Sequence, residues 1–126
     1  MLRKLLIFTS VMEMLTGLTL IIIPSVIVEL LFGINLSESV YILGRLSGII
    51  LLCFGIACLP FKENSEYNNY TPSVRAMMSY NFLASVYFFF LIFSTKTVGI
   101  LLIPAAILHA AITIYFAFLL FGKKGN

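Results

Sequence analysis

Four long apolar stretches occupy nearly the whole chain, and they constrain its fold more than any other feature. They cover about residues 5–31, 40–59, 76–93 and 98–121 of 126. A helix needs roughly 20 residues to cross a hydrocarbon core of about 30 Å. Each stretch meets that length, so the sequence predicts an all-α fold, an integral membrane antiparallel four-helix bundle. Residues 1–126 leave room for a single transmembrane domain.

Composition excludes an ordinary soluble domain. The chain is 61% hydrophobic and 10% charged, whereas about a quarter of the residues in a soluble domain are charged. The net charge of +3 does not gather into a basic patch, so no nucleic acid is expected as a partner. The lipid bilayer is the partner that the composition predicts, and a membrane-protein partner or a homo-oligomer stays open beside it.

Basic residues are distributed unequally between the two ends of the expected bundle. An even number of crossings puts both chain termini on one side of the membrane. That side holds Arg3, Lys4, Lys62, Arg75, Lys123 and Lys124. The other side holds only Lys96 and Arg45. The positive-inside rule therefore predicts cytoplasmic termini and a multi-pass protein of the cell inner (plasma) membrane.

The first stretch is longer than one straight crossing requires, and Pro24 lies in its outer third. Proline removes a backbone hydrogen bond and clashes with the preceding turn. It is expected either to kink the helix or to end the spanning part, leaving Val26–Phe32 as an interfacial segment. Gly33 then suits the C-cap position.

Short polar motifs mark where the later helices begin. Asn35-x-x-Glu38 predicts a capping box for the second helix. Thr71 before Pro72 is typical of an N-cap followed by proline in the first turn. The tight turn around 95–97 predicts that the last two helices are antiparallel neighbours.

Small and polar residues lie on one face of each helix, opposite Leu, Ile, Val and Phe. Lipid gives no reason to hide apolar side chains, so these faces are expected to meet inside the bundle. The glycines assigned to helix packing are Gly17, Gly44, Gly48 and Gly55. Gly44-x-x-x-Gly48 fits close packing within the bundle or a dimer contact, and the first interpretation is favoured.

One polar residue stands out in each apolar stretch. The four are Glu13, Arg45, Asn81 and His109. A charge near the bilayer centre costs about 2.5–3.5 kcal/mol, so such groups are normally paired and face inward. At a rise of about 1.5 Å per residue, they lie roughly 10 to 22 Å from the cytoplasmic edge. Arg45 has a second option, which is to extend outward toward Glu38 or Glu29.

Two interpretations of these four residues stay open. In one they line a small cavity for a ligand, a proton or a lipid headgroup, with hydroxyls from Tyr80, Tyr87 and Tyr115. In the other they are interhelical hydrogen bonds that fix the packing. The run 88–90, three phenylalanines, is expected to face lipid.

Other chemistry has little support in the sequence. There is one histidine, and Cys53 and Cys58 are turned about 140° apart on one helix. No metal site, cofactor or catalytic residue is therefore predicted, and an enzyme is the less favoured class of protein.

Three short segments carry a resemblance to a known group. They are Gly44-Arg-x-x-Gly48 continuing to Cys58, Tyr80-Asn81, and Pro104-Ala-x-x-Leu-His109-Ala. In these the chain resembles small uncharacterised four-helix bacterial membrane proteins, which are similar to the wider DoxX-like group. The resemblance implies a four-helix bundle in a bacterial inner membrane and a link to quinol oxidation or redox partners. It implies no catalytic residue.

The sequence thus favours an accessory or lipophilic-ligand-binding membrane component with a polar intramembrane site. The alternative is a homodimeric proton-coupled small-molecule exporter using Glu13. In length, helix number and the glutamate of its first helix, the chain is similar to small multidrug transporters. It departs from them in having no tryptophan, in the residues around Glu13 and in its strong topology bias.

Overall fold

The computed structural model describes residues 1–34, 37–60, 71–95 and 98–121. This part of the chain forms five helices, and the four long ones are long and apolar enough to cross a membrane. The helices are α1 (Leu2–Ile22), α2 (Pro24–Phe32), α3 (Glu38–Cys58), α4 (Thr71–Ser94) and α5 (Leu102–Phe121). The fold is the predicted all-α, four-helix membrane bundle, with one short additional helix.

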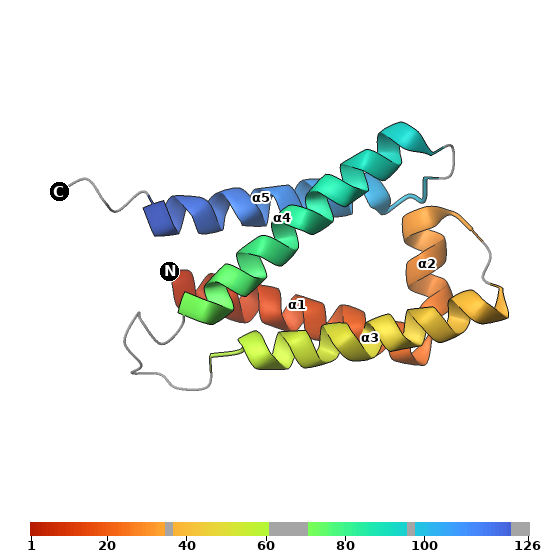
Figure 1. Cartoon of the computed structure of the whole chain (residues 1–126), viewed down its shortest axis with the longest axis horizontal. Coiled ribbons are helices and arrows are strands. Elements are labelled where there is room, and N and C mark those ends of the chain that lie inside the picture. The colour runs from red at the N-terminus through yellow and green to blue at the C-terminus, as the bar shows by residue number, and fades with distance from the viewer. Residues whose placement is uncertain (35–36, 61–70, 96–97, 122–126) are drawn as a thin grey trace.

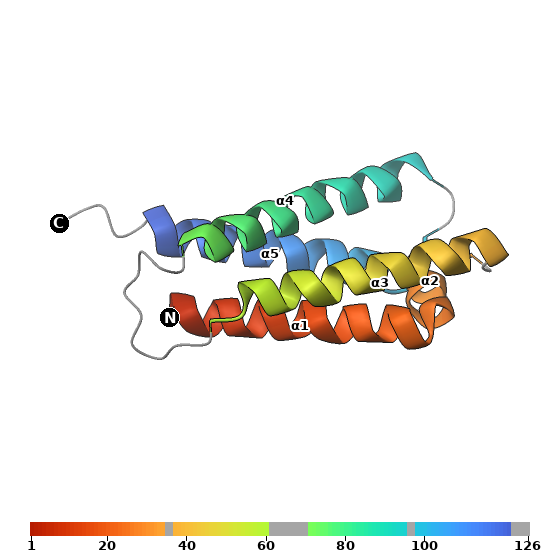
Figure 2. The ribbon, with the colours of Figure 1, turned by 60° about the horizontal axis from the view of Figure 1, so that its bottom comes forward.

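The bundle consists of two helical pairs (Figure 1). α1 packs along α3 and α4 packs along α5, whereas the two pairs touch each other far less. The chain reverses direction from each long helix to the next, so α1 begins and α5 ends at the same end of the bundle. In both views α4 diverges from α3 toward the opposite end, where α2 lies (Figure 2).

Pro24 divides the expected first helix in two. α1 ends at Ile22, and Ile23 leaves the helical region with φ −136° and ψ 72°. Pro24 has no amide hydrogen to continue the ladder, but its fixed φ suits the first turn of α2. The structure therefore corresponds to the second expectation, in which the spanning helix ends near the proline. The single helix over 5–31 is not what forms.

α2 crosses the end of the bundle and docks on the segment that leads into α5. Gly33 ends α2 in the left-handed conformation, with φ 65°. The Gly99 amide donates to the Leu31 carbonyl at 3.0 Å, and the Leu101 amide donates to the Leu30 carbonyl at 2.8 Å. These bonds satisfy carbonyls that a helix C-terminus leaves without partners. A Cβ on Gly99 would collide with the Leu30 carbonyl oxygen.

This docking explains one wrong boundary in the sequence analysis. The last helix was expected from residue 98, but α5 begins at Leu102. Residues 98–101 instead form the segment whose Gly99 and Leu101 amides bond to carbonyls of α2.

Two other helices begin earlier than their apolar stretches. α4 begins at Thr71, with Pro72 in its first turn, close to the start that the Thr71–Pro72 motif predicted. α3 begins at Glu38 after Ser37, whose side chain makes no capping hydrogen bond within the described residues. The capping box proposed at Asn35 lies outside the described residues.

Glycines allow α1 and α3 to approach backbone to backbone. A Cβ on Gly17 would lie 2.6 Å from the Leu52 amide nitrogen and 2.7 Å from the Gly48 carbonyl oxygen. A Cβ on Gly48 would lie 2.6 Å from the Gly17 carbonyl oxygen, and one on Gly55 would lie 2.8 Å from that of Ser10. Gly44 lies against the ring of Pro24. Both glycines of the Gly44-x-x-x-Gly48 motif thus lie against neighbouring segments of the same chain.

A cluster of buried apolar side chains lies toward the end that carries the N-terminus. Side chains from all four long helices are buried there. They are Leu6, Cys58, Val74, Met77, Ile112 and Phe116. The four helices therefore meet in a solid core at one end, whereas α2 closes the other.

The close contact of α1 and α3 makes a testable prediction at Gly48. Alanine normally stabilises a helix by about 1 kcal/mol relative to glycine, but here its Cβ would push two backbones apart. Gly48→Ala should lower the free energy of unfolding by about 1–3 kcal/mol, measured by denaturation in mixed micelles. Gly44→Ala is the matched control, because its Cβ would meet only the Pro24 ring. Equal effects of the two changes would contradict this packing.

Candidate functional site

A cavity of about 370 Å³ lies between the two helical pairs, beyond the packed core. Small-molecule sites usually enclose about 300–1,000 Å³. All five helices and the segment before α5 contribute to the wall. The lining residues are Thr9, Met12, Glu13, Thr16, Leu20, Ile27, Leu31, Leu51, Tyr80, Phe88, Leu101, Pro104, Ala105, Leu108, His109 and Ile112. The wall is thus largely apolar, with a small polar region.

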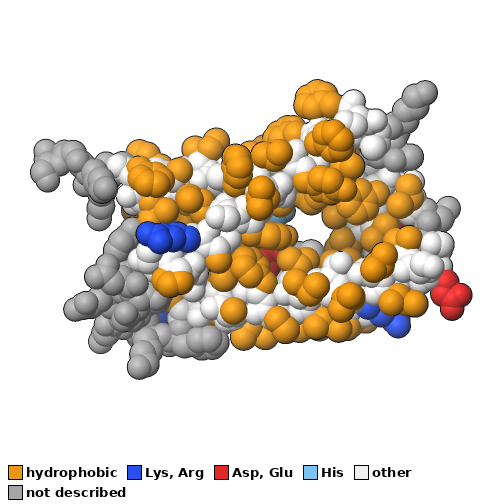
Figure 3. Space-filling model, viewed as in Figure 1, with side chains coloured by type: hydrophobic (Ala, Val, Ile, Leu, Met, Phe, Trp, Pro, Cys, Tyr) orange, Lys and Arg blue, Asp and Glu red, His pale blue; other side chains and the backbone are white. Residues whose placement is uncertain are grey.

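The cavity opens on the flank of the bundle (Figure 3). The hollow lies between α4 and the α1–α3 pair, and an acidic side chain and the histidine are visible inside it. Hydrophobic side chains cover most of the face around it. Because the long helices cross the membrane, an opening on their flank faces the acyl chains.

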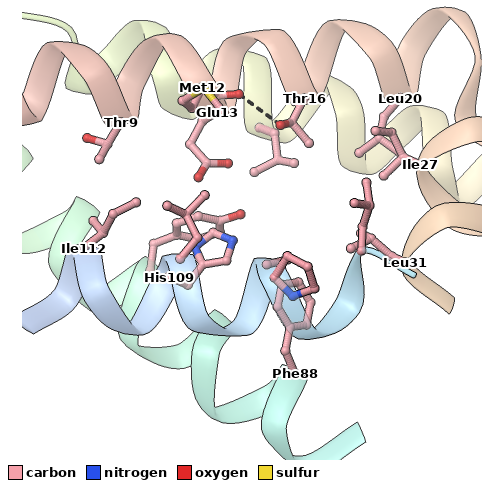
Figure 4. Close-up of a pocket in the computed structure, with 16 residues that line it drawn as sticks. Thr9, Met12, Glu13, Thr16, Leu20, Ile27, Leu31, Phe88, His109 and Ile112 are labelled. Atoms are coloured by element: carbon pink, nitrogen blue, oxygen red, sulfur yellow. Dashed lines mark hydrogen bonds between the residues drawn. The ribbon is translucent and has the colours of Figure 1, made fainter. Parts of the chain in front are cut away.

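Glu13 of α1 and His109 of α5 form the centre of the polar region. Their side chains point toward one another across the cavity (Figure 4). Glu13 is only 6% exposed, and the Tyr80 hydroxyl of α4 is a hydrogen-bond partner of its side chain. Three of the long helices therefore meet at one carboxyl group and its neighbours.

Asn81 is fully buried on α4 and orients the imidazole of His109. Its Nδ2 donates to the Met77 carbonyl of its own helix at 2.8 Å, which fixes the side-chain oxygen as the atom that faces α5. That oxygen lies 2.7 Å from His109 Nδ1. An amide oxygen only accepts, so Nδ1 carries the hydrogen and the neutral ring keeps an unprotonated Nε2.

Aromatic rings hold the imidazole from two sides. The Tyr80 and Phe88 rings make edge contacts with His109, with centroids at 5.8 Å and 5.5 Å. The Phe54 ring of α3 in turn packs against the Tyr80 ring, with the two ring centroids 5.2 Å apart. The ring of His109 is therefore held by contacts with α4 as well as by Asn81.

Two threonines of α1 flank Glu13 along the cavity wall. The Thr9 hydroxyl donates to the Leu5 carbonyl at 3.0 Å, with the Leu6 carbonyl at 3.1 Å. The Thr16 hydroxyl donates to the Met12 carbonyl at 2.9 Å. Each hydroxyl hydrogen is therefore used within α1.

The structure thus brings together three of the four polar residues singled out in the sequence, Glu13, Asn81 and His109. Arg45 does not join them. It is exposed on α3, and its guanidinium carbon lies 5.6 Å from the centre of the Tyr41 ring. A long charged side chain gains more from the interface than from an apolar interior, so Arg45 extends outward.

Some aromatic residues lie elsewhere than the sequence predicted. Phe88 lines the cavity, whereas Phe89 and Phe90 of the same run are exposed. Of the three tyrosines suggested as lining, Tyr80 lines the cavity, and Tyr87 and Tyr115 are exposed on the bundle surface. Successive helical residues point about 100° apart, so a run of three cannot share one environment.

The contribution of α2 to the cavity is not predicted from the sequence. Ile27 and Leu31 close the end of the cavity. Their positions depend on the angle between α1 and α2. Pro24 predicts an interruption of the helix there, but no local sequence signal predicts the angle.

The lining suits an organic molecule. Among the residues that the structure describes, no three His, Cys, Asp or Glu side chains are grouped so that they could hold a metal ion. Glu13 and His109 are the two ionisable ligand-type groups that face each other here. They provide hydrogen bonds to a polar group, and the apolar wall provides contact area for a hydrocarbon part.

Comparison of the chain with protein-family models, with curated proteins and with solved structures finds no match. The resemblance to the DoxX-like group therefore stays a prediction.

The Asn81–His109 hydrogen bond predicts the tautomer of the one histidine in the chain. With ¹⁵N-labelled histidine, NMR of the neutral form should show Nδ1 protonated and Nε2 unprotonated. Asn81→Ala removes the acceptor and should give a mixture of tautomers. Ser85→Ala is the control, because Ser85 is also buried on α4 but donates to the Phe82 carbonyl. Protonation at Nε2 in the unmodified protein would contradict the assignment.

Proposed function

We propose that the protein binds a lipophilic small molecule within the bilayer, as an accessory component of its membrane. The molecule enters from the acyl-chain region through the flank of the bundle. Its hydrocarbon part lies against the apolar wall, and its polar group lies between Glu13 and His109. The single observation that carries this proposal is a cavity of about 370 Å³ with apolar walls and one polar region.

Energetics support a binding site over a purely structural hydrogen-bond network. A buried carboxyl group in hydrocarbon is costly and is normally found where it serves a pathway or a ligand. A structural pair of this kind would be expected to pack without a gap, as Asn81 and His109 do. Instead, the carboxyl group of Glu13 faces an open volume.

The charge distribution supports the proposed orientation, with both termini in the cytoplasm of a bacterial cell and the helices in its inner membrane. Arg3, Lys4 and Arg75 lie at the end of the bundle where α1 begins. Glu29 and Glu38 lie on the elements of the opposite end. Lys62, Lys96, Lys123 and Lys124 lie outside the described residues. Cytoplasmic loops are enriched in Lys and Arg.

The partners of Glu13 favour a site within one chain over the homodimeric exporter. Tyr80 and His109, which face the carboxyl group, come from the same chain. A binding site of this kind needs no second copy to complete it.

Filling the cavity tests the proposal. Ala105 lines the cavity, and Ala111 is exposed on the same helix outside it. Ala105→Phe should weaken saturable uptake of radiolabelled decanol by protein-containing nanodiscs at least tenfold, which is a difference of about 1.4 kcal/mol. Ala111→Phe should leave uptake unchanged. Protein-free discs give the background, and equal uptake by the two variants would contradict the proposal.

A further inference from the structure

We propose that the ligand of this cavity is a lipophilic amine or alcohol, because the polar groups around the cavity present hydrogen-bond acceptors and keep their own hydrogens within the protein. This inference rests on the proposed function and names the chemistry of the head group that the site selects.

The imidazole supplies the first acceptor. The Nδ1 hydrogen of His109 is used by Asn81, so the neutral ring has only the lone pair of Nε2 left to offer. Within the described residues, no hydrogen bond is made by Nε2. The ring projects into the cavity from α5 (Figure 4), so this lone pair is available to a ligand.

The two threonines present acceptors in the same way. Their hydroxyl hydrogens go to carbonyls one turn back on α1. A hydroxyl oxygen has two lone pairs besides its one hydrogen, so Thr9 and Thr16 have no donor left for a ligand in the cavity that they line. They lie on either side of Glu13 along the helix.

Tyr80 and Glu13 complete the set. The phenolic hydrogen of Tyr80 is directed to the Glu13 side chain, so Tyr80 keeps no donor for the cavity. In its carboxylate form, Glu13 has acceptors only. Both donors of the Asn81 amide lie outside the cavity wall, where Nδ2 meets the Met77 carbonyl. The head group of a ligand between Glu13 and His109 therefore meets acceptors from α1 and α5.

This pattern discriminates between ligands of similar size and polarity. An ammonium or hydroxyl group donates to these acceptors and is satisfied. An ether or ketone head group brings only lone pairs, so it loses its hydrogen bonds to the membrane interface and regains none in the cavity. A polar group buried without a partner binds less favourably by a factor of roughly 5 to 150.

A matched series of probes tests the inference. Decylamine, decanol and decyl methyl ether share one alkyl chain and differ in the head group. Saturable uptake by protein-containing nanodiscs, corrected with protein-free discs, should be about tenfold tighter for the amine and the alcohol than for the ether. Addition of decanol should also shift the ¹⁵N resonance of His109 Nε2 and leave that of Nδ1 nearly unchanged.

Replacement of the Glu13 carboxyl group is a second test of the head-group selection. Glu13→Gln introduces an amide with hydrogens of its own, so the preference for decanol over the ether should fall to about twofold or less. Glu29→Gln is the matched control, because Glu29 is an exposed carboxylate on α2 outside the cavity, and it should keep the full preference. The His109 resonances of the unmodified protein serve as a readout that does not depend on the folding of either variant.

The outcomes separate the two proposals. If the ether binds as tightly as decanol and Ala105→Phe abolishes both, the cavity binds lipophilic molecules but the head-group selection is wrong. If none of the three probes shows saturable uptake, the proposed function fails and this inference fails with it. If decanol shifts the ¹⁵N resonance of His109 Nδ1 and not that of Nε2, the assignment of Nε2 as the acceptor is wrong.

Discussion

The structure depends on one constraint: hydrocarbon offers no water to satisfy a polar group, so a polar group there is costly unless it finds a partner inside the protein. The long helices meet this requirement for their backbones. Where α2 ends, its last carbonyl groups have no partner within the helix. The backbone amides of Gly99 and Leu101 donate hydrogen bonds to two of them. The threonine hydroxyls of α1 return to their own helix, and Asn81 joins Met77 to His109.

A second consequence concerns where packing is tight and where it is not. Lipid gives helices no hydrophobic reason to associate, so close contact relies on small residues. Gly17, Gly48 and Gly55 supply this between α1 and α3. Between the two helical pairs, one cluster of buried bulky side chains lies around Met77 and Phe116. The remaining space becomes the cavity, and its apolar wall and polar region are the basis of the proposed role in binding a lipophilic molecule.

Several features of the site were accessible from the sequence for clear physical reasons. Glu13, Asn81 and His109 stand out because polar groups in apolar helices are costly, and their similar depths predict that they can meet. Arg45 has the same cost, but its long side chain lets it reach the interface and the Tyr41 ring. The position of Phe88 could not be predicted from the sequence. Which face of α4 lines the cavity depends on how far α4 diverges from α3, and no local pattern gives that.

By itself, the sequence determined the number of crossings, the break at Pro24 and the use of the small and polar faces as contacts, because these follow from local hydrophobicity, backbone geometry and residue size. Tertiary structure decided that α2 folds across the end of the bundle, that residues 98–101 bond to it instead of extending α5, and that Tyr80 accompanies Glu13. These features depend on contacts between segments far apart in the chain, and no local pattern encodes the angle at which two helices meet.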